Sequence, residues 1–380
     1  MLEPAEGALL AFCREDTTDM KCVMLVGGEG TRLRPLTYSI PKQMLPIVEM
    51  TMIERVVDHL SRSGVDEAVL SLGYKPDVFI EAFPDGQLRG VKLKYAVEPE
   101  PLDTAGAIKF AAEYAGIDET FLVVNGDVLT DAPPSLLVAF HKSHSAEATV
   151  ALTPVEDPSA FGVVVTGEDG RVSDFIEKPP AGTAPTNLIN AGTYVLEPSV
   201  LNRISSGRKV SIEREVFPGL AADGSLYASS SDLYWLDAGT PAQYLQAHQD
   251  LLSGIRGPSP HSQAVRIGND TDIVWSLGDS EIEGSVTGPT MLGAGCRVLV
   301  GARVVASTVG SGCVVGSNAI VENSVILPGA VISDGSRVVD SIIGYGAIVG
   351  DKALVENLSI VGNGQVIEPG VSLNGDKVPN

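Results

Sequence analysis

Apolar residues in the first two thirds of the chain fall into short runs that alternate with amphipathic segments. Residues 21–26 (KCVMLV), 69–72 and 121–124 are runs of strand length, and a Gly or an Asn-Gly pair follows each of them. Residues 51–63 repeat apolar positions at helical spacing, at Ile53, Val56, Val57 and Leu60. This alternation predicts a Rossmann-like α/β domain with a mixed, mostly parallel sheet covered by helices on both faces. Ligands of such sheets bind outside the carboxyl ends of the strands.

The pattern changes after residues 254–260 (GIRGPSP), a Gly/Pro/Ser stretch that is typical of a linker. From there an aliphatic residue recurs every six positions in two phases, the second displaced by a short insertion. The first phase consists of Val309, Val315, Val321, Leu327 and Val339, interrupted at Ser333, and the second of Ile343, Val349, Val355, Val361 and Ile367. A small or apolar residue follows four positions later, at Cys313, Ala319, Val325, Val331, Ala347, Ala353 and Ser359.

A period of six with small residues at the turns predicts a left-handed parallel β-helix. The alternative is a β-sandwich, but its strands vary in length and rarely keep one phase through so many turns. We therefore expect an extension of unknown purpose over residues 1–19, an α/β domain over residues 20–255 and a β-helix over residues 256–380. The first residues carry acidic groups ahead of a short apolar patch, which is the wrong charge order for a signal peptide.

Charge and cysteine content narrow the classes of function. The chain has 26 Lys and Arg against 48 Asp and Glu, a net charge of −22, which argues against nucleic-acid binding. A phosphorylated small molecule remains compatible with a few basic groups in a cleft. No apolar run approaches the length of about 20 residues that spans a bilayer, so no membrane association is expected.

The cysteines, Cys13, Cys22, Cys296 and Cys313, show no metal or disulfide spacing and favour a reduced, cytoplasmic location. Cys296 and Cys313 share one small-residue position on neighbouring coils, so we expect two stacked, buried thiols.

The sequence GGEGTRLRPLT, residues 27–37, follows the first predicted strand directly. Its glycines let backbone amides approach an anion, and Arg32 and Arg34 add bidentate donors. Neither the P-loop nor the dinucleotide fingerprint fits, because no Gly-Lys-Ser/Thr closes the turn and Leu33 stands where a third glycine belongs. Lys42, in PKQMLP, is within reach of the same phosphates, although a lone lysine is more often a solvated surface residue.

GxGTRLRPLT followed by PKxMLP is the signature of sugar nucleotidylyltransferases, and the chain resembles this family from about residue 21 to its end. Further motifs of the family occur in the expected order, at residues 125–127 (NGD), 175–179 (FIEKP), 190–192 (NAG) and 235–240 (WLDAGT). Many members carry a left-handed β-helix behind the catalytic domain. Bacterial mannose-1-phosphate guanylyltransferases of this two-domain plan look most alike.

The resemblance implies an in-line attack by a sugar-phosphate oxygen on the α-phosphorus of a nucleoside triphosphate, with release of pyrophosphate. It assigns Arg32 to the triphosphate, Lys42 to the α-phosphate and Lys178 to the sugar phosphate. Asp127 and Asp237 would together hold Mg²⁺, an ion that suits carboxylate and phosphate oxygens. The other assignments are to the nucleotide, Gly27, Gly28, Gly30, Thr31, Glu98, Thr104 and Gly106, and to the sugar, Glu177, Asn190 and Gly192. Taken singly, an Asp or Asn after a strand is more often a turn residue or a helix cap.

The segment EPEPLDTAG, residues 98–106, resembles the base-binding loop of the family, where pyrimidine-using relatives tend to have Gln in place of Glu98. An acceptor-only carboxylate suits the adjacent N–H donors of guanine, so Glu98 points to GTP. Guanylyl relatives usually have Gly where Asp103 stands, and Asp tolerates left-handed backbone better than most residues. Mannose 1-phosphate follows from whole-chain likeness alone.

Other functions stay open at this point. The alternatives within the family are a glucose-1-phosphate uridylyl-, thymidylyl- or adenylyltransferase and a non-catalytic regulatory homologue. An acetyltransferase β-helix generally needs a histidine base, and no histidine falls within the coils. We expect the β-helix to serve homo-oligomerisation, since its flat faces and open end favour self-association.

Overall fold

The computed structural model describes residues 20–257, 259–268 and 272–379. The predicted extension over residues 1–19, with Cys13, lies outside the described residues. The described chain divides into two compact units. The sheet unit consists of residues 20–28 and 53–235, and the β-helix unit consists of residues 29–52 and 236–379. Each unit has its own hydrophobic core. The domain boundary expected between residues 255 and 256 stays a prediction.

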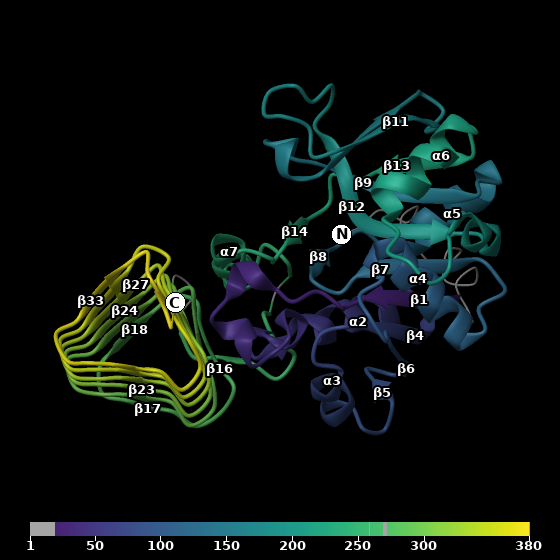
Figure 1. The fold of residues 1–380 in the computed structure, drawn as a ribbon. Coiled ribbons are helices and arrows are strands. Elements are labelled where there is room, and N and C mark those ends of the chain that lie inside the picture. Colours follow the sequence, from purple (N-terminus) through teal and green to yellow (C-terminus); the bar gives the residue numbers. More distant parts are fainter. Residues whose placement is uncertain (1–19, 258, 269–271, 380) are drawn as a thin grey trace, which may run out of the picture. The chain divides into compact units, whose positions relative to one another are not determined.

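The sheet unit is built on a mixed ten-stranded sheet (Figure 1). Its central strands run in the order β7-β1-β4-β6 and are all parallel, while β12 pairs antiparallel with β7. The predicted α/β architecture is therefore confirmed. The strands are β1 (Met20–Leu25), β4 (Val65–Leu72), β5 (Gln87–Leu88), β6 (Val91–Val97), β7 (Phe121–Asn125), β9 (Ala148–Pro154), β10 (Gly162–Thr166), β11 (Val172–Glu177), β12 (Leu188–Leu196) and β13 (Leu226–Ser230). A further short strand is β8 (Val128–Thr130).

Helices pack against this sheet along their apolar faces. The helix predicted over residues 51–63 is α2 (Met52–Arg62), and its four predicted apolar residues are all buried, as expected. Helix α4 (Asp103–Ala115) packs against β1, β4 and β6, and α5 (Pro134–His144) packs against β9, β12 and β13. The other helical segments are α3 (Pro76–Ala82), η4 (Pro158–Ala160), η5 (Pro198–Arg203), η6 (Ile212–Val216) and α6 (Phe217–Ala222). No helix among the described residues is long and apolar enough to cross a bilayer.

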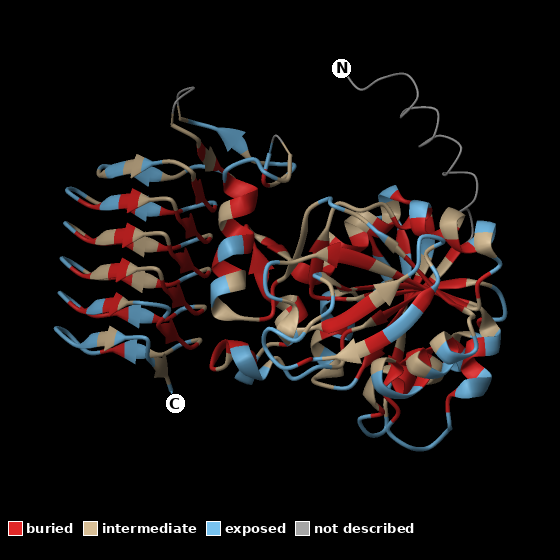
Figure 2. Cartoon of the chain, turned by 90° about the horizontal axis from the view of Figure 1, so that it is seen from above, coloured by how far each residue is buried: buried red, intermediate tan, exposed pale blue. Residues whose placement is uncertain are grey.

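The β-helix unit is dominated by three sheets that stack coil upon coil around a triangular core (Figures 1 and 2), and their strands are parallel except where β15 pairs with β16. The left-handed parallel β-helix predicted from the sequence is confirmed. The first sheet contains β15 (Val265–Arg266), β16 (Val274–Ser276), β19 (Thr290–Leu292), β22 (Thr308–Val309), β25 (Val325–Ile326), β28 (Ile342–Ile343), β31 (Ile360–Val361) and β34 (Lys377–Val378). The second contains β17 (Glu281–Ile282), β20 (Arg297–Val298), β23 (Val314–Val315), β26 (Val331–Ile332), β29 (Ile348–Val349) and β32 (Val366–Ile367). The third contains β18 (Ser285–Thr287), β21 (Arg303–Val305), β24 (Ile320–Glu322), β27 (Arg337–Val339), β30 (Leu354–Glu356) and β33 (Ser372–Asn374).

The strict period of six predicted for the coils is wrong in one respect. Val309 pairs with Ile326 and Ile326 with Ile343, so a coil there has 17 residues, and one of its three sides is one residue short. The core is therefore filled by Ile326, Ile332 and Val338, and Leu327 and Val339 are not core positions. The small-residue positions are shifted by one residue in the same way: Ser324 and Ala330 occupy them in place of Val325 and Val331, and both are fully buried. The change of phase before Ile343 thus comes from two shortened sides, one in each of these coils, and not from an insertion.

The two predicted stacked thiols lie on neighbouring coils inside the β-helix. Cys296 and Cys313 are buried and free of disulfides, as is Cys22 in the sheet unit, and these are the cysteines of the described chain. The thiol of Cys296 donates to Gly310 O at 3.1 Å and that of Cys313 to Leu327 O at 3.2 Å. Burial raises the pKa of Cys296 to about 11 and that of Cys313 to about 12, so both stay protonated and unreactive near neutral pH.

The first sheet of the β-helix is covered on its outer face within its own unit. Its outward column, Thr308, Val325, Ile342 and Ile360, is fully buried. Two pieces of chain belong to the same compact unit as these coils: residues 29–52, here called the loop segment, and helix α7 (Pro241–Leu252). The loop segment contains η1 (Thr31–Leu33), η2 (Leu36–Tyr38), η3 (Lys42–Met44), β2 (Pro46–Ile47) and β3 (Met50–Thr51). Helix α7 contacts the coils through His248 Nδ1, 2.8 Å from Thr308 Oγ1.

Candidate functional site

Arg32 and Asp237, distant in sequence, lie together in the β-helix unit. The guanidinium Nη2 of Arg32 is 3.6 Å from Asp237 Oδ2, and the Asp237 side chain is only 18% exposed. The other carboxylate oxygen, Oδ1, accepts a hydrogen bond from Gly239 N at 2.9 Å. A Cβ on Gly239 would lie 2.8 Å from that oxygen and closer still to Arg32 Nη2, so glycine is required for the guanidinium to lie there. Thr240 then caps α7, with Pro241 as the first helical residue, which fixes the turn that carries Asp237.

The backbone around Gly30 folds tightly over Lys42. Gly30 has φ +63°, and a Cβ there would lie 2.9 Å from Lys42 Cβ and 3.0 Å from Thr37 Cγ2. Thr37 Oγ1 donates to Gly30 O at 2.9 Å and closes the turn. Glycine is thus needed here both for its left-handed backbone and for close packing. The consequence is that Thr31, Arg32 and Lys42 project from one compact loop.

Arg34 is arranged differently from Arg32. Its Nη2 donates to Glu29 Oε2 at 2.6 Å, and its guanidinium lies 5.4 Å from the ring centre of Tyr38. Its charge is therefore partly used within the loop, and Arg32 is the better candidate for a phosphate ligand.

In the sheet unit, Glu98 lies beside Gly27, at the carboxyl ends of β6 and β1, the two strands that flank β4. Glu98 Oε1 accepts from Ser71 Oγ at 2.8 Å, and Oε2 accepts from Leu102 N at 3.1 Å. A Cβ on Gly27 would meet Gly73 N at 3.2 Å and Glu98 Oε1 at 3.4 Å, whereas one on Gly28 would meet nothing. The carboxylate is thus held in place by two internal donors and still has lone pairs for a ligand.

Asp103 occupies the conformation that its place in the motif demands. Its φ is +61°, in the left-handed region, and its Oδ1 accepts from Thr104 N at 2.8 Å. Its Oδ2 pairs with Arg214 Nη2 at 2.9 Å, an ion pair across 111 residues. The left-handed backbone of Asp103 is therefore accommodated through local hydrogen bonding and a salt bridge.

The hydroxyl and the glycine that follow Asp103 have structural partners. Thr104 Oγ1 donates to Glu213 Oε2 at 2.7 Å and accepts from Ile212 N at 2.9 Å. A Cβ on Gly106 would lie 2.8 Å from Leu102 Cβ and 3.4 Å from Arg208 O. Thr104 and Gly106 thus hold the start of α4 against residues 208–213, and their predicted contact with nucleotide stays a prediction.

The predicted sugar-binding residues of β12 lie next to the Asn125-Gly126-Asp127 turn. Gly192 has φ +75°, and a Cβ there would meet Asn125 Nδ2 at 2.6 Å. Asn190 Oδ1 accepts from Gly192 N at 2.9 Å, while its Nδ2 donates to Tyr194 Oη at 2.9 Å. The strand register shifts between Asn190 and Tyr194, so this stretch is an irregular bulge. Asp127 itself is buried and comes two residues after the end of β7.

Lys178 is held in a strained backbone conformation at the end of β11. Its φ is +49°, and its N–H donates to Phe161 O at 3.0 Å. The ammonium lies 3.3 Å from Glu177 Oε1, and its side chain is 66% exposed. A lysine in the left-handed region costs about 1 kcal/mol or more, a strain that is often retained at functional sites. The exposed ammonium is therefore available to an anionic ligand.

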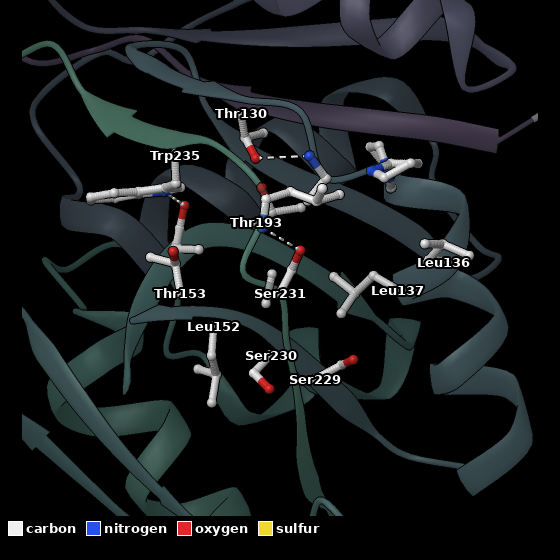
Figure 3. A pocket seen from close by; sticks show the side chains of 16 residues that line it. Thr130, Leu136, Leu137, Leu152, Thr153, Thr193, Ser229, Ser230, Ser231 and Trp235 are labelled. Atoms are coloured by element: carbon white, nitrogen blue, oxygen red, sulfur yellow. Dashed lines mark hydrogen bonds between the residues drawn. The ribbon is translucent and has the colours of Figure 1, made fainter. Parts of the chain in front are cut away.

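A separate cavity of about 140 Å³ lies in the sheet unit (Figure 3). It is lined largely by apolar groups, among them Leu136, Leu137 and Leu152, and by Ala191, which stands between the predicted sugar-binding residues Asn190 and Gly192. Two of its hydroxyls, Thr130 Oγ1 and Ser231 Oγ, accept from backbone amides, and Trp235 Nε1 donates to Ala191 O at 2.9 Å. None of the predicted site residues lines it, so we assign it no part in the reaction.

Comparison with known proteins decides the family. A sequence model described as Nucleotidyl transferase matches residues 21–254, more than half of the chain. The chain belongs to this family. A second model, described as GMPPB C-terminal domain, matches residues 286–380 of this nucleotidyltransferase.

The sequences of named relatives are similar to most of this chain. A mannose-1-phosphate guanylyltransferase of Mycobacterium tuberculosis is 39% identical over 80% of this chain and 84% of its own. A probable mannose-1-phosphate guanylyltransferase of Oryza sativa is 39% identical over 81% of this chain and 86% of its own. Among solved structures, HddC from Yersinia pseudotuberculosis, complexed with GMP-PN, is 30% identical with a TM-score of 0.53. It covers 61% of this nucleotidyltransferase and 99% of its own chain.

Nucleotidyltransferases of this family generally use a divalent metal ion. Among the described residues, no group of three or more His, Cys, Asp and Glu side chains is arranged to hold one. One or two carboxylates, together with phosphate oxygens and water, are the donors that suit Mg²⁺. Asp237 suits this role, because its carboxylate supplies hard oxygen donors beside the Arg32 guanidinium.

The predicted site residues are distributed over the two compact units. Arg32, Lys42 and Asp237 belong to the β-helix unit, while Glu98, Asp127, Glu177, Lys178, Asn190 and Gly192 belong to the sheet unit. The joint metal site of Asp127 and Asp237 therefore stays a prediction. The sequence did not single out Ser71, whose hydroxyl donates to Glu98, or Gly239, whose lack of a side chain leaves room for Arg32. Only Gly239 could have been found from the sequence, because it is the glycine of the WLDAGT motif.

Proposed function

We propose that this nucleotidyltransferase joins GTP to mannose 1-phosphate and yields GDP-mannose and pyrophosphate. The observation that carries the proposal is the likeness to mannose-1-phosphate guanylyltransferases over four fifths of the chain. Glu98 supports it chemically. Its carboxylate is fixed by Ser71 and Leu102 and can accept from the adjacent N1–H and N2–H₂ donors of guanine.

The proposed reaction is a single in-line displacement. A phosphate oxygen of the sugar phosphate forms a bond to the α-phosphorus of GTP, and the bond from that phosphorus to the β-phosphate oxygen breaks. Lys178 would hold the incoming phosphate, and Arg32 and Lys42 the triphosphate, so that two polyanions are aligned. Mg²⁺ bound by Asp127 and Asp237 would supply charge neutralisation. We place the reaction in the cytoplasm, which the protonated, unpaired cysteines support.

The proposal is tested by pyrophosphate release with Mg²⁺, crossing GTP, UTP, dTTP and ATP against mannose 1-phosphate and glucose 1-phosphate. We expect turnover with GTP and mannose 1-phosphate to exceed every other pair. Preference for a pyrimidine triphosphate would refute the base assignment and leave the reaction class. No turnover with any pair, from folded protein, would refute the proposed substrates altogether.

Glu98→Gln is expected to lower kcat/KM for GTP by about tenfold to a hundredfold and to raise the relative use of UTP and dTTP. The fold tolerates the change, because the amide oxygen can accept from Leu102 N while the amide nitrogen donates to Ser71 Oγ. The Ser71 hydroxyl can then donate to Ala107 O, which lies 3.4 Å away. Kinetics with each triphosphate measure the effect. Glu100→Gln, an exposed carboxylate of the same segment, is the control and should change nothing. An unchanged triphosphate preference in Glu98→Gln would show that Glu98 does not read the base.

We further propose that copies of the chain associate through the second sheet of the β-helix. Its outward column is apolar over four coils, because Val314, Val331, Ile348 and Val366 follow one another in register. Ile348 is 38% and Val366 56% exposed. The first sheet is covered within the unit, and the third carries outward charges such as Arg303 and Arg337. A continuous apolar column is typical of a face that is covered by a second copy.

Ile348→Lys is expected to reduce the molar mass in solution to that of a smaller assembly or a monomer, because it buries a charge in the interface. Light scattering after size exclusion measures it. Leu354→Lys, equally exposed on the third sheet, should leave the assembly intact. Equal behaviour of the two variants would contradict the assignment of this face.

A further inference from the structure

The β-helix donates hydrogen bonds to the main chain of the loop segment, which carries Arg32 and Lys42. Lys377 Nζ, on β34 in the last coil, donates to Arg32 O at 2.9 Å. Asn363, in the turn after β31, donates through Nδ2 to Leu36 O at 3.2 Å and to Ser39 Oγ at 2.7 Å. Arg32 O and Leu36 O are carbonyls in short 3₁₀ turns, whose terminal carbonyls lack helical partners. Lysine donors commonly satisfy such carbonyls.

Asn363 is itself oriented by the coil. Its Oδ1 accepts from Tyr345 N at 3.0 Å, which turns the amide nitrogen towards the loop segment. Beside it, the backbone of Gly362 is so close to Pro35 that a Cβ would lie 3.1 Å from Pro35 Cγ. The last coil therefore fits the η1–η2 turns by shape as well as by hydrogen bonds.

A second anchor lies on the other side of Lys42. The hairpin of β2 and β3 turns through Val48 and Glu49, with φ +52° and +63°, a conformation that normally requires Asn-Gly. The Glu49 carboxylate accepts from Ser311 N at 2.7 Å and from Ser311 Oγ at 3.2 Å. A strained turn persists where its surroundings hold it, and here an early coil of the β-helix does so.

From these contacts we propose that the β-helix positions the triphosphate-binding loop, with Asn363 and Lys377 as positioning residues for Arg32. The proposal rests on the proposed function and adds to it a direct role of the β-helix in nucleotide binding. Lys377 fixes the carbonyl of the residue whose guanidinium reaches Asp237. Loss of this contact releases the main chain of Arg32 and weakens the alignment of its guanidinium, while the predicted sugar-phosphate residues, in the sheet unit, are untouched.

The test uses the full chain with Lys377→Met and Asn363→Asp. Methionine keeps the length of the lysine stem without its donor, and aspartate keeps the acceptor for Tyr345 N without the donor to Leu36 O. Each should raise KM for GTP about tenfold, the weight of one hydrogen bond from a charged or well-oriented donor, with KM for mannose 1-phosphate unchanged. Lys377→Arg should restore the wild-type KM. Arg297→Met, which removes a cation from the second sheet of the β-helix, is the matched control and should have no effect.

Hydrogen–deuterium exchange without substrate separates this proposal from the proposed function. We expect faster exchange of the amides of residues 31–39 in Lys377→Met and Asn363→Asp and no change in Arg297→Met. Unchanged exchange there, or faster exchange spread over all the coils, would overturn the positioning role. Faster local exchange in a protein without guanylyltransferase activity would overturn the proposed substrates and leave the positioning role standing.

Discussion

Asp237→Asn should lower kcat for nucleotidyl transfer about a thousandfold, which corresponds to ~4 kcal/mol in the activation barrier. The carboxylate does two things that an amide cannot. It offers an anionic oxygen to a hard cation, and it faces the Arg32 guanidinium at 3.6 Å with Oδ2 while Gly239 N binds Oδ1. In the variant the amide oxygen keeps the bond from Gly239, so the amide nitrogen, a donor, is turned towards another donor. Pyrophosphate release measured over a range of Mg²⁺ concentrations should show a low kcat that added metal does not recover.

The matched control is Asp232→Asn, an exposed aspartate five residues earlier, which should retain full activity. Thermal unfolding of both variants should lie close to that of the wild type, because Asn keeps the shape of the side chain. Retention of more than about a tenth of kcat in Asp237→Asn would argue against a metal-binding carboxylate, since metal-ion charge stabilisation is worth several kcal/mol.

The fold could be predicted from the sequence because the two parts of the chain repeat their apolar residues with different periods. Burial on one helix face fixed α2 through Ile53, Val56, Val57 and Leu60, and the recurring aliphatics with small residues fixed the β-helix. The register of the coils could not be predicted as well. Two adjacent aliphatic residues stand at Ile326 and Leu327 and again at Val338 and Val339, so hydrophobicity alone does not say which of each pair fills the core. The sheet ladder decides it, through pairing at a spacing of 17 residues.

The candidate site was less accessible to sequence reasoning. A glycine-rich turn after a strand and a lysine nearby are visible locally, but the partners of Asp103 and Thr104, namely Arg214 and Glu213, lie more than a hundred residues away. These long-range contacts depend on the tertiary fold. The same holds for Lys377 and Asn363, which no motif marks. Sequence patterns thus indicated the candidate side chains, and the packing around them showed which of these side chains also make structural contacts.

Gly239→Ala should lower kcat/KM for GTP about a hundredfold without unfolding the protein, an effect of ~3 kcal/mol. The new Cβ would overlap the position of Arg32 Nη2 and lie 2.8 Å from Asp237 Oδ1. Arg32 is the group that gives way, because its side chain is flexible and 57% exposed. The guanidinium is then displaced from the place where it would stabilise the developing charge of pyrophosphate, and misplacement by about 1 Å can cost two orders of magnitude in rate. Steady-state kinetics with varied GTP measure the loss.

Gly219→Ala is the appropriate control, since Gly219 lies in α6 and a Cβ there would meet nothing within 4 Å. It should keep wild-type kinetics and gain slightly in stability, because alanine favours a helix more than glycine does. If Gly239→Ala behaves as Gly219→Ala does, Arg32 works from a different position than the one beside Asp237. A loss in Gly239→Ala that is accompanied by unfolding would point instead to the turn before α7, and the unfolding temperature of the two alanine variants separates these results.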